Sequence, residues 1–249
     1  MGQKDSELTI GADERVWMEV MKPLVMNALG ARRSRRSFLG AVTFGAAGVL
    51  APGVFAEELT RTARVEEGPF YPDKLPLDTD NDLLIVNDSI TPAVGEVTHL
   101  SGRLLDARGD PIKNALIEIW QVDSTGTYLR ARGSRPNYDR NFQGFGRFLT
   151  SSSGEYYFRT IKPVAYNGRP APHIHFAVKM KGREKWTTQL FVKGDPGNER
   201  DGLYRRIREG KLRESVTAEF LPLKNSRIGE LAARFDIVMG NAAEREDRR

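Results

Sequence analysis

Short runs of β-forming residues, each closed by a turn signal, constrain the fold of this chain more than any other feature of its sequence. Such runs occur at residues 97–105, 115–122, 155–160, 173–180, 186–192, 215–222 and 234–239. Segments rich in Gly, Asp, Ser and Pro separate them, as at residues 106–111, 123–126 and 151–154. Short strands at this spacing predict an all-β fold with a β-sandwich core. We also expect one helical stretch near residues 200–209 and a long functional loop across residues 131–148.

The chain offers few types of side chain that can bind a metal. Its 249 residues include no cysteine, which excludes disulfides and thiolate metal sites, and the three histidines are His99, His173 and His175. Any metal site must therefore use His, Tyr, Asp or Glu. Outside the first 56 residues, 31 basic side chains are balanced by 28 acidic ones, without a cluster of basic and aromatic residues. Nucleic acid is therefore not expected as a partner.

The first 56 residues have the features of an export signal. The run SRRSFLG at Ser34–Gly40 contains twin arginines followed by Phe and Leu, and an apolar stretch, Ala41–Ala51, comes after it. That stretch is too short to span a bilayer, and residues 54–56 fit a cleavage site. The segment resembles a Tat signal, which predicts export to the periplasm or the medium and no membrane span in the mature chain, residues 57–249. A basic, amphipathic N-terminal arm is the alternative.

His173 and His175 are spaced so that both can bind one ion. On a strand, side chains two residues apart point to the same face, about 6–7 Å apart along the chain. Ile174 between them would point into the core. Two exposed strand residues are the simpler interpretation of such a pair. A cupin-like metal site is excluded, because no Glu follows within a few residues and no further His follows His175.

Two tyrosines, Tyr128 and Tyr166, lie in turn-like surroundings. A phenol with a pKa of ~10 binds as tyrosinate at neutral pH only beside a strong Lewis acid, and its hard anionic oxygen favours Fe(III) over Zn(II) or Cu(I). A buried ring with a solvated hydroxyl is the simpler interpretation of either tyrosine alone. Near the His pair, Arg169 can stabilise an anion, and Gln189 lies on the next predicted strand. Each of these two could equally be an ordinary surface or strand residue.

Together these residues resemble the intradiol ring-cleavage dioxygenases, especially the protocatechuate 3,4-dioxygenase branch and its beta subunit. The resemblance covers residues 65–239. It rests on the stretches EGPFYP (67–72), GRLLDARGDPIKNALIEIWQVDSTGTY (102–128), NFQGFGRFLTSSSGEYYFRTIKPVAY (141–166), RPAPHIHF (169–176), TTQLFVKGDP (187–196) and RFDIVM (234–239).

The resemblance implies a non-haem Fe(III) enzyme with the ligands Tyr128, Tyr166, His173 and His175. It also implies that the enzyme opens a catechol-type ring between its two hydroxyls with O2, giving a cis,cis-muconate-type diacid. Tyr166 would leave the iron and take up a substrate proton, and Arg169 and Gln189 would stabilise charge on the ring. Arg169 stands four residues before the first ligand His, whereas the family usually has three.

Several alternatives remain open on the sequence alone. The ring could be protocatechuate, catechol or a hydroxyquinol-like compound. Because one chain carries the full ligand set, it could act alone or as a homo-oligomer. A non-catalytic, transthyretin-like β-sandwich binding module would suit residues 102–119, although it has no need of the Tyr and His spacings. A metalloenzyme with His99 as a third imidazole is a further alternative.

Overall fold

A computed structural model describes residues 58–86, 91–134 and 136–240 of the chain. The predicted export signal, residues 1–56, lies outside the described residues, so its function stays a prediction.

The described residues form two five-stranded sheets, which confirms the expected all-β fold. The strands are β1 (Val97–Asp106), β2 (Leu116–Trp120), β3 (Phe145–Leu149), β4 (Glu155–Ile161), β5 (His173–Lys179), β6 (Trp186–Val192), β7 (Thr217–Ala218), β8 (Phe220–Pro222), β9 (Leu231–Arg234) and β10 (Ile237–Met239).

Strand β1 organises the first sheet. It runs antiparallel to β4, from Val97 opposite Ile161 to Arg103 opposite Glu155. It also pairs in parallel with β9 and, further along, with β10, while β8 extends the sheet beyond β9.

The second sheet has the strand order β3-β2-β5-β6-β7, in which the pair β6–β7 is parallel and the other pairs are antiparallel. Its register places Trp120 of β2 opposite His175 of β5, and His175 opposite Gln189 of β6. Side chains directly opposite each other lie on the same face of a sheet. These three side chains therefore form a row across one face.

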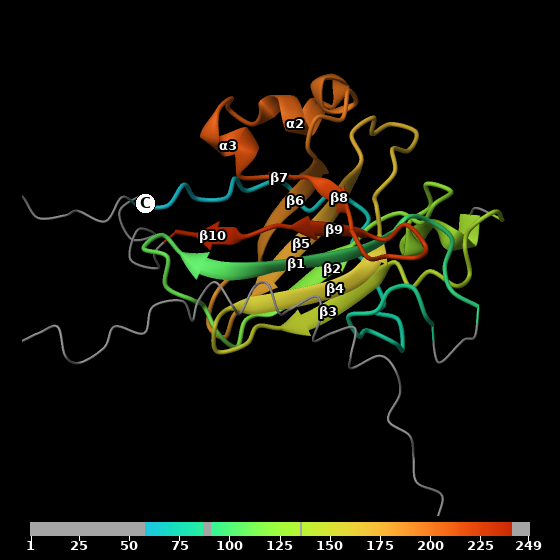
Figure 1. The fold of residues 1–249 in the computed structure, drawn as a ribbon, viewed down its shortest axis with the longest axis horizontal. Coiled ribbons are helices and arrows are strands. Elements are labelled where there is room, and N and C mark those ends of the chain that lie inside the picture. The colour runs from blue at the N-terminus through green and yellow to red at the C-terminus, as the bar shows by residue number, and fades with distance from the viewer. Residues whose placement is uncertain (1–57, 87–90, 135, 241–249) are drawn as a thin grey trace, which may run out of the picture. The chain divides into compact units, whose positions relative to one another are not determined.

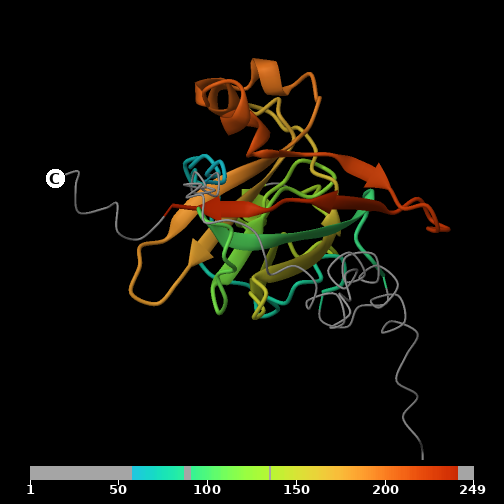
Figure 2. The ribbon, with the colours of Figure 1, turned by 60° about the vertical axis from the view of Figure 1, so that its left-hand side comes forward.

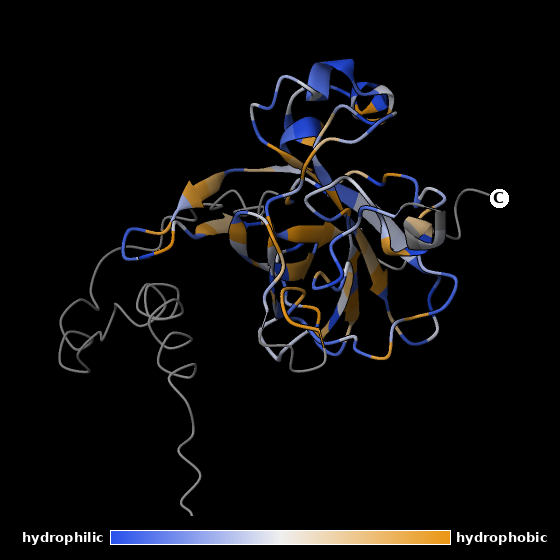
Figure 3. Ribbon diagram, turned by 90° about the vertical axis from the view of Figure 1, so that its right-hand side faces the viewer, coloured by the Kyte–Doolittle hydropathy of each residue, from blue (hydrophilic) through white to orange (hydrophobic). Residues whose placement is uncertain are grey.

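Side chains from both sheets share one hydrophobic core. Its fully buried members include Leu100 and Phe158 from the first sheet and Ile117, Ile174 and Phe176 from the second. The sheets lie as two layers in Figure 1, and Figure 3 shows their strands as the most hydrophobic part of the ribbon. Because side chains alternate along a strand, the neighbours of these core residues face the other side of the second sheet. That side carries the candidate site.

The helices are short. They are the 3-10 helices η1 (Leu129–Ser134) and η2 (Asn198–Arg200) and the α-helices α2 (Gly202–Arg206) and α3 (Lys211–Glu214). All but η1 belong to the connection between β6 and β7, residues 193–216, which we call the helical connection. The helices α2 and α3 stand at one edge of the sheets (Figures 1 and 2). Among the described residues, none of the helices is both long enough and apolar enough to cross a bilayer.

Some elements differ from the sequence-based expectation. Strand β3 occupies residues 145–149, where we expected the end of a long loop. Its sequence, FGRFL, contains a glycine and follows another at φ +73°, so it carries a weak strand signal. The expected strand 215–222 is divided because β7 pairs with β6 whereas β8 pairs with β9. The expected helix at 200–209 is the shorter α2.

Candidate metal centre

His173 and His175 lie on β5, which is flanked by β2 and β6 in the second sheet. Ile174 between them is fully buried in the shared core, so the two imidazoles point together to the opposite face. Both histidines are buried, and their ring centroids are 4.9 Å apart. The Trp120 ring stacks on His175 at a centroid distance of 4.8 Å and an interplanar angle of 11°.

Tyr128 follows β2 in a turn that a buried carboxylate organises. One oxygen of Asp123, Oδ1, accepts hydrogen bonds from the backbone N–H groups of Thr125 (2.9 Å) and Thr127 (3.0 Å). Its other oxygen, Oδ2, accepts one from the backbone of Asp139 at 2.8 Å. Asp123 itself is fully buried, so these bonds fix the turn. The Tyr128 ring is therefore held over the sheet.

Tyr166 and Arg169 are the two ends of one tight turn. The backbone N–H of each donates to the carbonyl oxygen of the other, at 3.1 and 2.9 Å. Gly168 in the turn has φ +92°, a conformation that favours glycine. The turn places a tyrosine and an arginine at its two ends, and both side chains are partly exposed.

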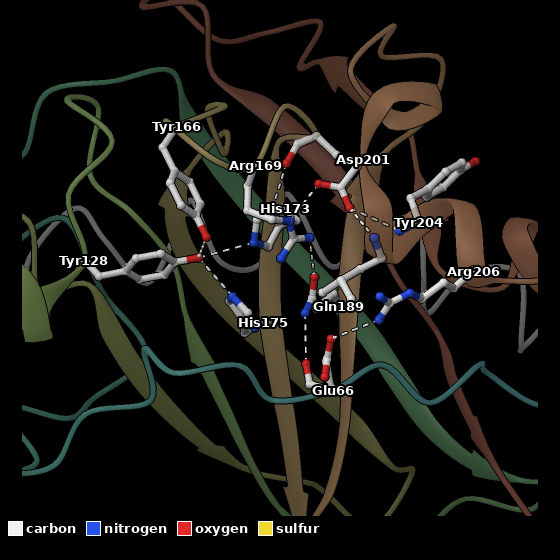
Figure 4. Close-up of polar contacts among 12 residues, drawn as sticks. Glu66, Tyr128, Tyr166, Arg169, His173, His175, Gln189, Asp201, Tyr204 and Arg206 are labelled. Carbon is white, nitrogen blue, oxygen red and sulfur yellow. Dashed lines mark hydrogen bonds and ion pairs between the residues drawn. The ribbon is translucent and has the colours of Figure 1, made fainter.

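The side chains of Tyr128, Tyr166, His173 and His175 converge, and we call them the four-residue cluster (Figure 4). The Tyr128 hydroxyl lies 2.9 Å from His175 Nε2, 3.2 Å from His173 Nε2 and 3.5 Å from the Tyr166 hydroxyl. All four ligands that the family resemblance implies are thus present in one cluster.

Burial controls protonation in this cluster. Burial lowers the pKa of His173 to about 4, and the Arg169 guanidinium adds to the effect. Burial and the neighbouring His173 also hold the pKa of His175 well below its usual range. Burial raises the pKa of Tyr128 and of Tyr166 above the ordinary value for a phenol. At pH 7 the cluster therefore consists of neutral imidazoles and of phenols that ionise only beside a cation.

The ring tautomer of His173 directs a lone pair toward the centre of the cluster. His173 Nδ1 lies 2.7 Å from the carbonyl oxygen of Ala171, which can only accept, so the ring proton belongs on Nδ1 and Nε2 carries a lone pair. The Tyr128 hydroxyl can donate its single proton to only one of the two imidazoles, and the other ring is satisfied without a metal only if its own proton faces Tyr128. A cation among these atoms would be bound by the lone pairs of both rings and of both phenol oxygens.

The spacing of the donor atoms also fits a metal ion. Metal bonds to nitrogen and oxygen of about 2.0–2.2 Å place neighbouring ligands roughly 3 Å apart, which agrees with separations of 2.9 to 3.5 Å around the Tyr128 hydroxyl. Nowhere in the described part of the chain do three or more His, Asp or Glu side chains gather as a metal site. A metal at this position would therefore depend on the phenol oxygens.

Arg169 and Gln189 lie beside the cluster and contact each other. Arg169 Nη2 donates to Gln189 Oε1 at 2.8 Å, and Arg169 Nε donates to Asp201 Oδ2 at 2.6 Å. Gln189 Nε2 donates to the carbonyl oxygen of Glu66 at 2.9 Å. Compared with the family pattern, one more residue lies between Arg169 and His173, yet Arg169 still contacts Gln189.

Residues 66–71, which we call the covering segment, lie across the cluster. The Phe70 ring stacks on the Tyr128 ring, with centroids 4.4 Å apart and an interplanar angle of 9°. Arg130, two residues beyond Tyr128, donates to the carbonyl oxygen of Pro69 at 2.5 Å. Sequence reasoning noted this segment but assigned no role to Phe70.

His99 does not join the cluster. It lies on β1 in the first sheet, where its ring nitrogens contact the Tyr157 hydroxyl and, at 3.2 Å, a carboxylate oxygen of Glu230. Sequence reasoning also missed Asp201. Its signal was an Asp at the start of the helical stretch predicted near residues 200–209, since Asp is a preferred helix N-cap, although nothing in that signal indicated a contact with Arg169.

Two imidazoles and two phenols that converge on one face of a two-sheet, all-β fold form a candidate site for a hard metal ion. A family model described as "Dioxygenase" matches residues 66–240, well over half of the chain. The chain belongs to the intradiol ring-cleavage dioxygenase family.

Curated relatives bear the names of several intradiol enzymes. The chain is 33% identical over 155 residues to a protocatechuate 3,4-dioxygenase beta chain from Burkholderia cepacia, covering 59% of this chain and 65% of the relative. It is 30% identical over 178 residues to catechol 1,2-dioxygenase 2 from Acinetobacter lwoffii, covering 62% of each chain. The chain thus spans less than two thirds of the length of these relatives.

Solved structures of similar fold include the dioxygenase domain of a dioxygenase–carbohydrate-binding fusion protein from Streptomyces sp. SirexAA-E. It is 25% identical with a TM-score of 0.56, and the match covers 74% of this chain and all of that domain. Catechol 1,2-dioxygenase from Acinetobacter sp. ADP1 is 26% identical with a TM-score of 0.55, and the match covers 72% of this chain and 63% of that one.

Proposed function

We propose that this protein is a non-haem Fe(III) intradiol dioxygenase that opens a catechol-type ring between its two hydroxyls with O2 and forms a cis,cis-muconate-type diacid. The observation that carries the proposal is the four-residue cluster, in which two imidazole nitrogens and a second phenol surround the Tyr128 hydroxyl at 2.9 to 3.5 Å. Names of relatives that include protocatechuate, catechol and hydroxyquinol dioxygenases support the same reaction class.

Tyr128, Tyr166, His173 and His175 would hold the iron. Two phenolates and two neutral imidazoles suit a hard trivalent cation, because the phenolates offset most of its charge. When bound, Fe(III) would draw electron density from a catecholate ring and make the ring reactive toward O2. The protein would supply the ligands, the orientation of the substrate and the groups that move protons.

The two tyrosines would have different roles. The Tyr128 ring is almost completely buried, lies under Phe70 and faces both imidazoles, so we assign it as the permanent ligand. Tyr166 is more exposed and lies on a tight turn next to Arg169. Tyr166 would therefore accept a proton from a substrate hydroxyl at its phenol oxygen as the substrate binds.

Arg169 would stabilise negative charge on the substrate ring. Its guanidinium is permanently charged, lies beside the cluster, and lowers the pKa of both tyrosines against the effect of burial. A cation fixed in advance near developing negative charge lowers the barrier of such a reaction. Gln189 would assist by holding this guanidinium, to which its side-chain oxygen is bonded.

We further propose that residues 57–249 form one β-sandwich catalytic domain and that residues 1–56 direct its export through a Tat-type route. The supporting observations are the twin arginines in SRRSFLG and the apolar run that follows. A fusion of residues 1–56 to a reporter protein would test export, and replacement of Arg35 and Arg36 by lysine should abolish it. Export that continues in this variant would contradict the Tat assignment.

The activity itself is tested with the iron-loaded full chain. Visible spectra are recorded before and after anaerobic addition of catechol, protocatechuate or hydroxyquinol, and oxygen uptake and the ring-opened product are then measured in air. We expect a broad tyrosinate-to-Fe(III) band that shifts with the preferred ring. Tyr157→Phe, which changes a tyrosine of the first sheet, serves as the control and should keep the band.

A colourless protein that contains stoichiometric zinc or no metal would refute the dioxygenase proposal. That outcome would instead favour a non-catalytic, transthyretin-like binding module. A protein with the visible band that binds catechols without oxygen uptake would be a binding protein built on the same fold.

A further inference from the structure

Asp201 divides its two carboxylate oxygens between two tasks. Oδ1 accepts hydrogen bonds from the backbone N–H groups of Leu203 (3.0 Å) and Tyr204 (3.1 Å), and so caps the first turn of α2. Oδ2 accepts the hydrogen bond from Arg169 Nε at 2.6 Å. The carboxylate therefore connects the helical connection to the proposed active site, and Figure 4 shows it on the side of Arg169 away from Tyr128.

The carboxylate is held in its ionised form. Asp201 has no exposed surface, and burial alone would raise its pKa. The hydrogen bond from Arg169 and those from the α2 backbone outweigh burial, so the pKa lies below the ordinary value for aspartate. A buried carboxylate with this set of partners is fixed in place, because each lost partner would leave a charge unsatisfied.

Arg169 is held at two points of its guanidinium plane, by Asp201 at Nε and by Gln189 at Nη2. The orientation of the Gln189 amide follows from its other partner. The carbonyl oxygen of Glu66 can only accept, so the Gln189 amide nitrogen must face it and the amide oxygen faces Arg169. Two contacts at different nitrogens fix the plane of the group as well as its position, which a single contact would not.

We propose that Asp201 is a positioning residue that sets the guanidinium plane of Arg169, and through it the stabilisation of charge on the substrate ring. The catalytic part of this inference rests on the proposed function, whereas the contact itself does not. The arrangement gives the helical connection a part in the reaction. It also supplies an anchor for an arginine that stands one residue further from the first ligand His than the family pattern has it.

The division of oxygens allows the two tasks of Asp201 to be separated by one substitution. In Asp201→Asn the remaining oxygen can still cap α2, since asparagine is as good an N-cap as aspartate. The amide nitrogen would then face Arg169 Nε, and two donors cannot bond to each other. Asp195→Asn is the matched control, because Asp195 Oδ1 accepts from the Gly197 backbone at 2.7 Å and has no cationic partner among the described residues.

We expect Asp201→Asn to remain folded with a Tm roughly 6–12 °C below that of Asp195→Asn, because its partner Arg169 is left mostly buried without a counter-charge. Measured below that Tm, its kcat should fall by about 100-fold, as a misplaced catalytic group typically causes. KM should change little, because the contact serves charge that develops during the reaction. Asp195→Asn should keep the wild-type kcat. If Asp201→Asn fails to fold, Asp201→Ser keeps a capping oxygen and is too short to reach Arg169, and it should show the same loss.

A double-mutant cycle tests whether Asp201 acts through Arg169. In an Arg169→Gln background, Asp201→Asn should change kcat by less than about 3-fold, since the group it positions is gone. Two independent and multiplicative losses would overturn the proposal, as would full activity of Asp201→Asn.

A measurement without turnover separates this inference from the proposed function. In proton–nitrogen correlation spectra of the iron-free full chain, we expect the Arg169 Nε–H signal, identified by its loss in Arg169→Lys, to exchange slowly with water. It should exchange rapidly in Asp201→Asn and remain slow in Asp195→Asn. An Arg169 signal that is unchanged in Asp201→Asn would overturn the positioning role. If the Arg169 Nε–H signal exchanges slowly in a protein that neither binds iron nor consumes oxygen, the dioxygenase function is refuted, whereas the contact between Asp201 and Arg169 is supported.

Discussion

Glu118 is predicted to be the largest single electrostatic contributor to stability on the site face of the second sheet. Its side chain has no exposed surface, yet it carries a carboxylate. Arg147 Nη2 and Lys179 Nζ each lie 2.9 Å from its oxygens, and the Tyr71 hydroxyl donates to it at 2.8 Å. Removing the charge at Glu118 would leave these three groups without their common partner.

The substitution Glu118→Gln keeps the size of the side chain and removes its charge. Breaking a buried ion pair costs about 3–5 kcal/mol. The lower end applies, because the side chains of Arg147 and Lys179 are 29% and 36% exposed and can turn toward water. A loss of about 3 kcal/mol corresponds to a fall in Tm of roughly 6–12 °C for a domain of this size.

Thermal unfolding followed by circular dichroism measures this effect. Glu155→Gln is the matched control, because Glu155 pairs with Arg103 at 3.3 Å with both side chains more than one third exposed. Such surface pairs contribute about 0–1 kcal/mol, or at most a shift of roughly 4 °C. The reasoning fails if Glu118→Gln shifts Tm no more than Glu155→Gln does. The same reasoning requires that Lys179→Met lowers the free energy of unfolding less in the Glu118→Gln variant than in the wild type.

Three further outcomes are expected. As the pH falls from 6.5 to 4, His173 alone should lower the stability of the iron-free protein by about 3 kcal/mol, because burial lowers its pKa to about 4 in the folded state and the unfolded chain therefore binds the extra proton. His175, whose pKa is also lowered by burial, should add to this loss. Urea unfolding should show this loss in the wild type, and a curve of the same steepness in His173→Gln would contradict it. After dialysis of the iron-loaded proteins, the Tyr128→Phe variant should retain less iron than the Tyr166→Phe variant, since the Tyr128 hydroxyl lies within 3.2 Å of both imidazoles. Equal iron contents in the two variants would refute that ranking. Gly102→Ala should destabilise the protein by more than about 2 kcal/mol, because the added Cβ would lie 1.8 Å from a backbone carbonyl oxygen. Gly133→Ala is the control, since a Cβ at Gly133 would have no atom within 4 Å, and similar Tm values for the two variants would exclude this steric clash.

The sequence predicted the elements whose signal is local. His173 and His175 were expected to share a face because a strand repeats every two residues, and β5 bears this out. The row of Trp120, His175 and Gln189 could not be predicted, because it depends on the register between three strands. Register is set by contacts between distant segments rather than by the pattern of any one strand.

Buried charge was the least predictable feature. In β2, LIEIW, alternation assigns Ile117 and Ile119 to the core and therefore Glu118 to the opposite face, which would ordinarily be solvent. The covering segment changes that environment, since Tyr71 contacts Glu118 from 47 residues away. Likewise, the ion pair of Asp201 with Arg169 joins residues 32 apart. No local pattern contains either contact.

The proposed ligands differ in how firmly the fold holds them, and this difference agrees with their proposed roles. The two histidines belong to β5, which has a strand on each side, and Tyr128 lies on the turn that Asp123 fixes, beneath Phe70. Tyr166 lies on its tight turn with Arg169 and is partly exposed, and its ring makes edge contacts with Phe70 and Tyr128. A ligand that must leave the metal and carry a proton has to move, whereas the other three must stay when it does. The ligand with the least support is therefore the one suited to act as the base.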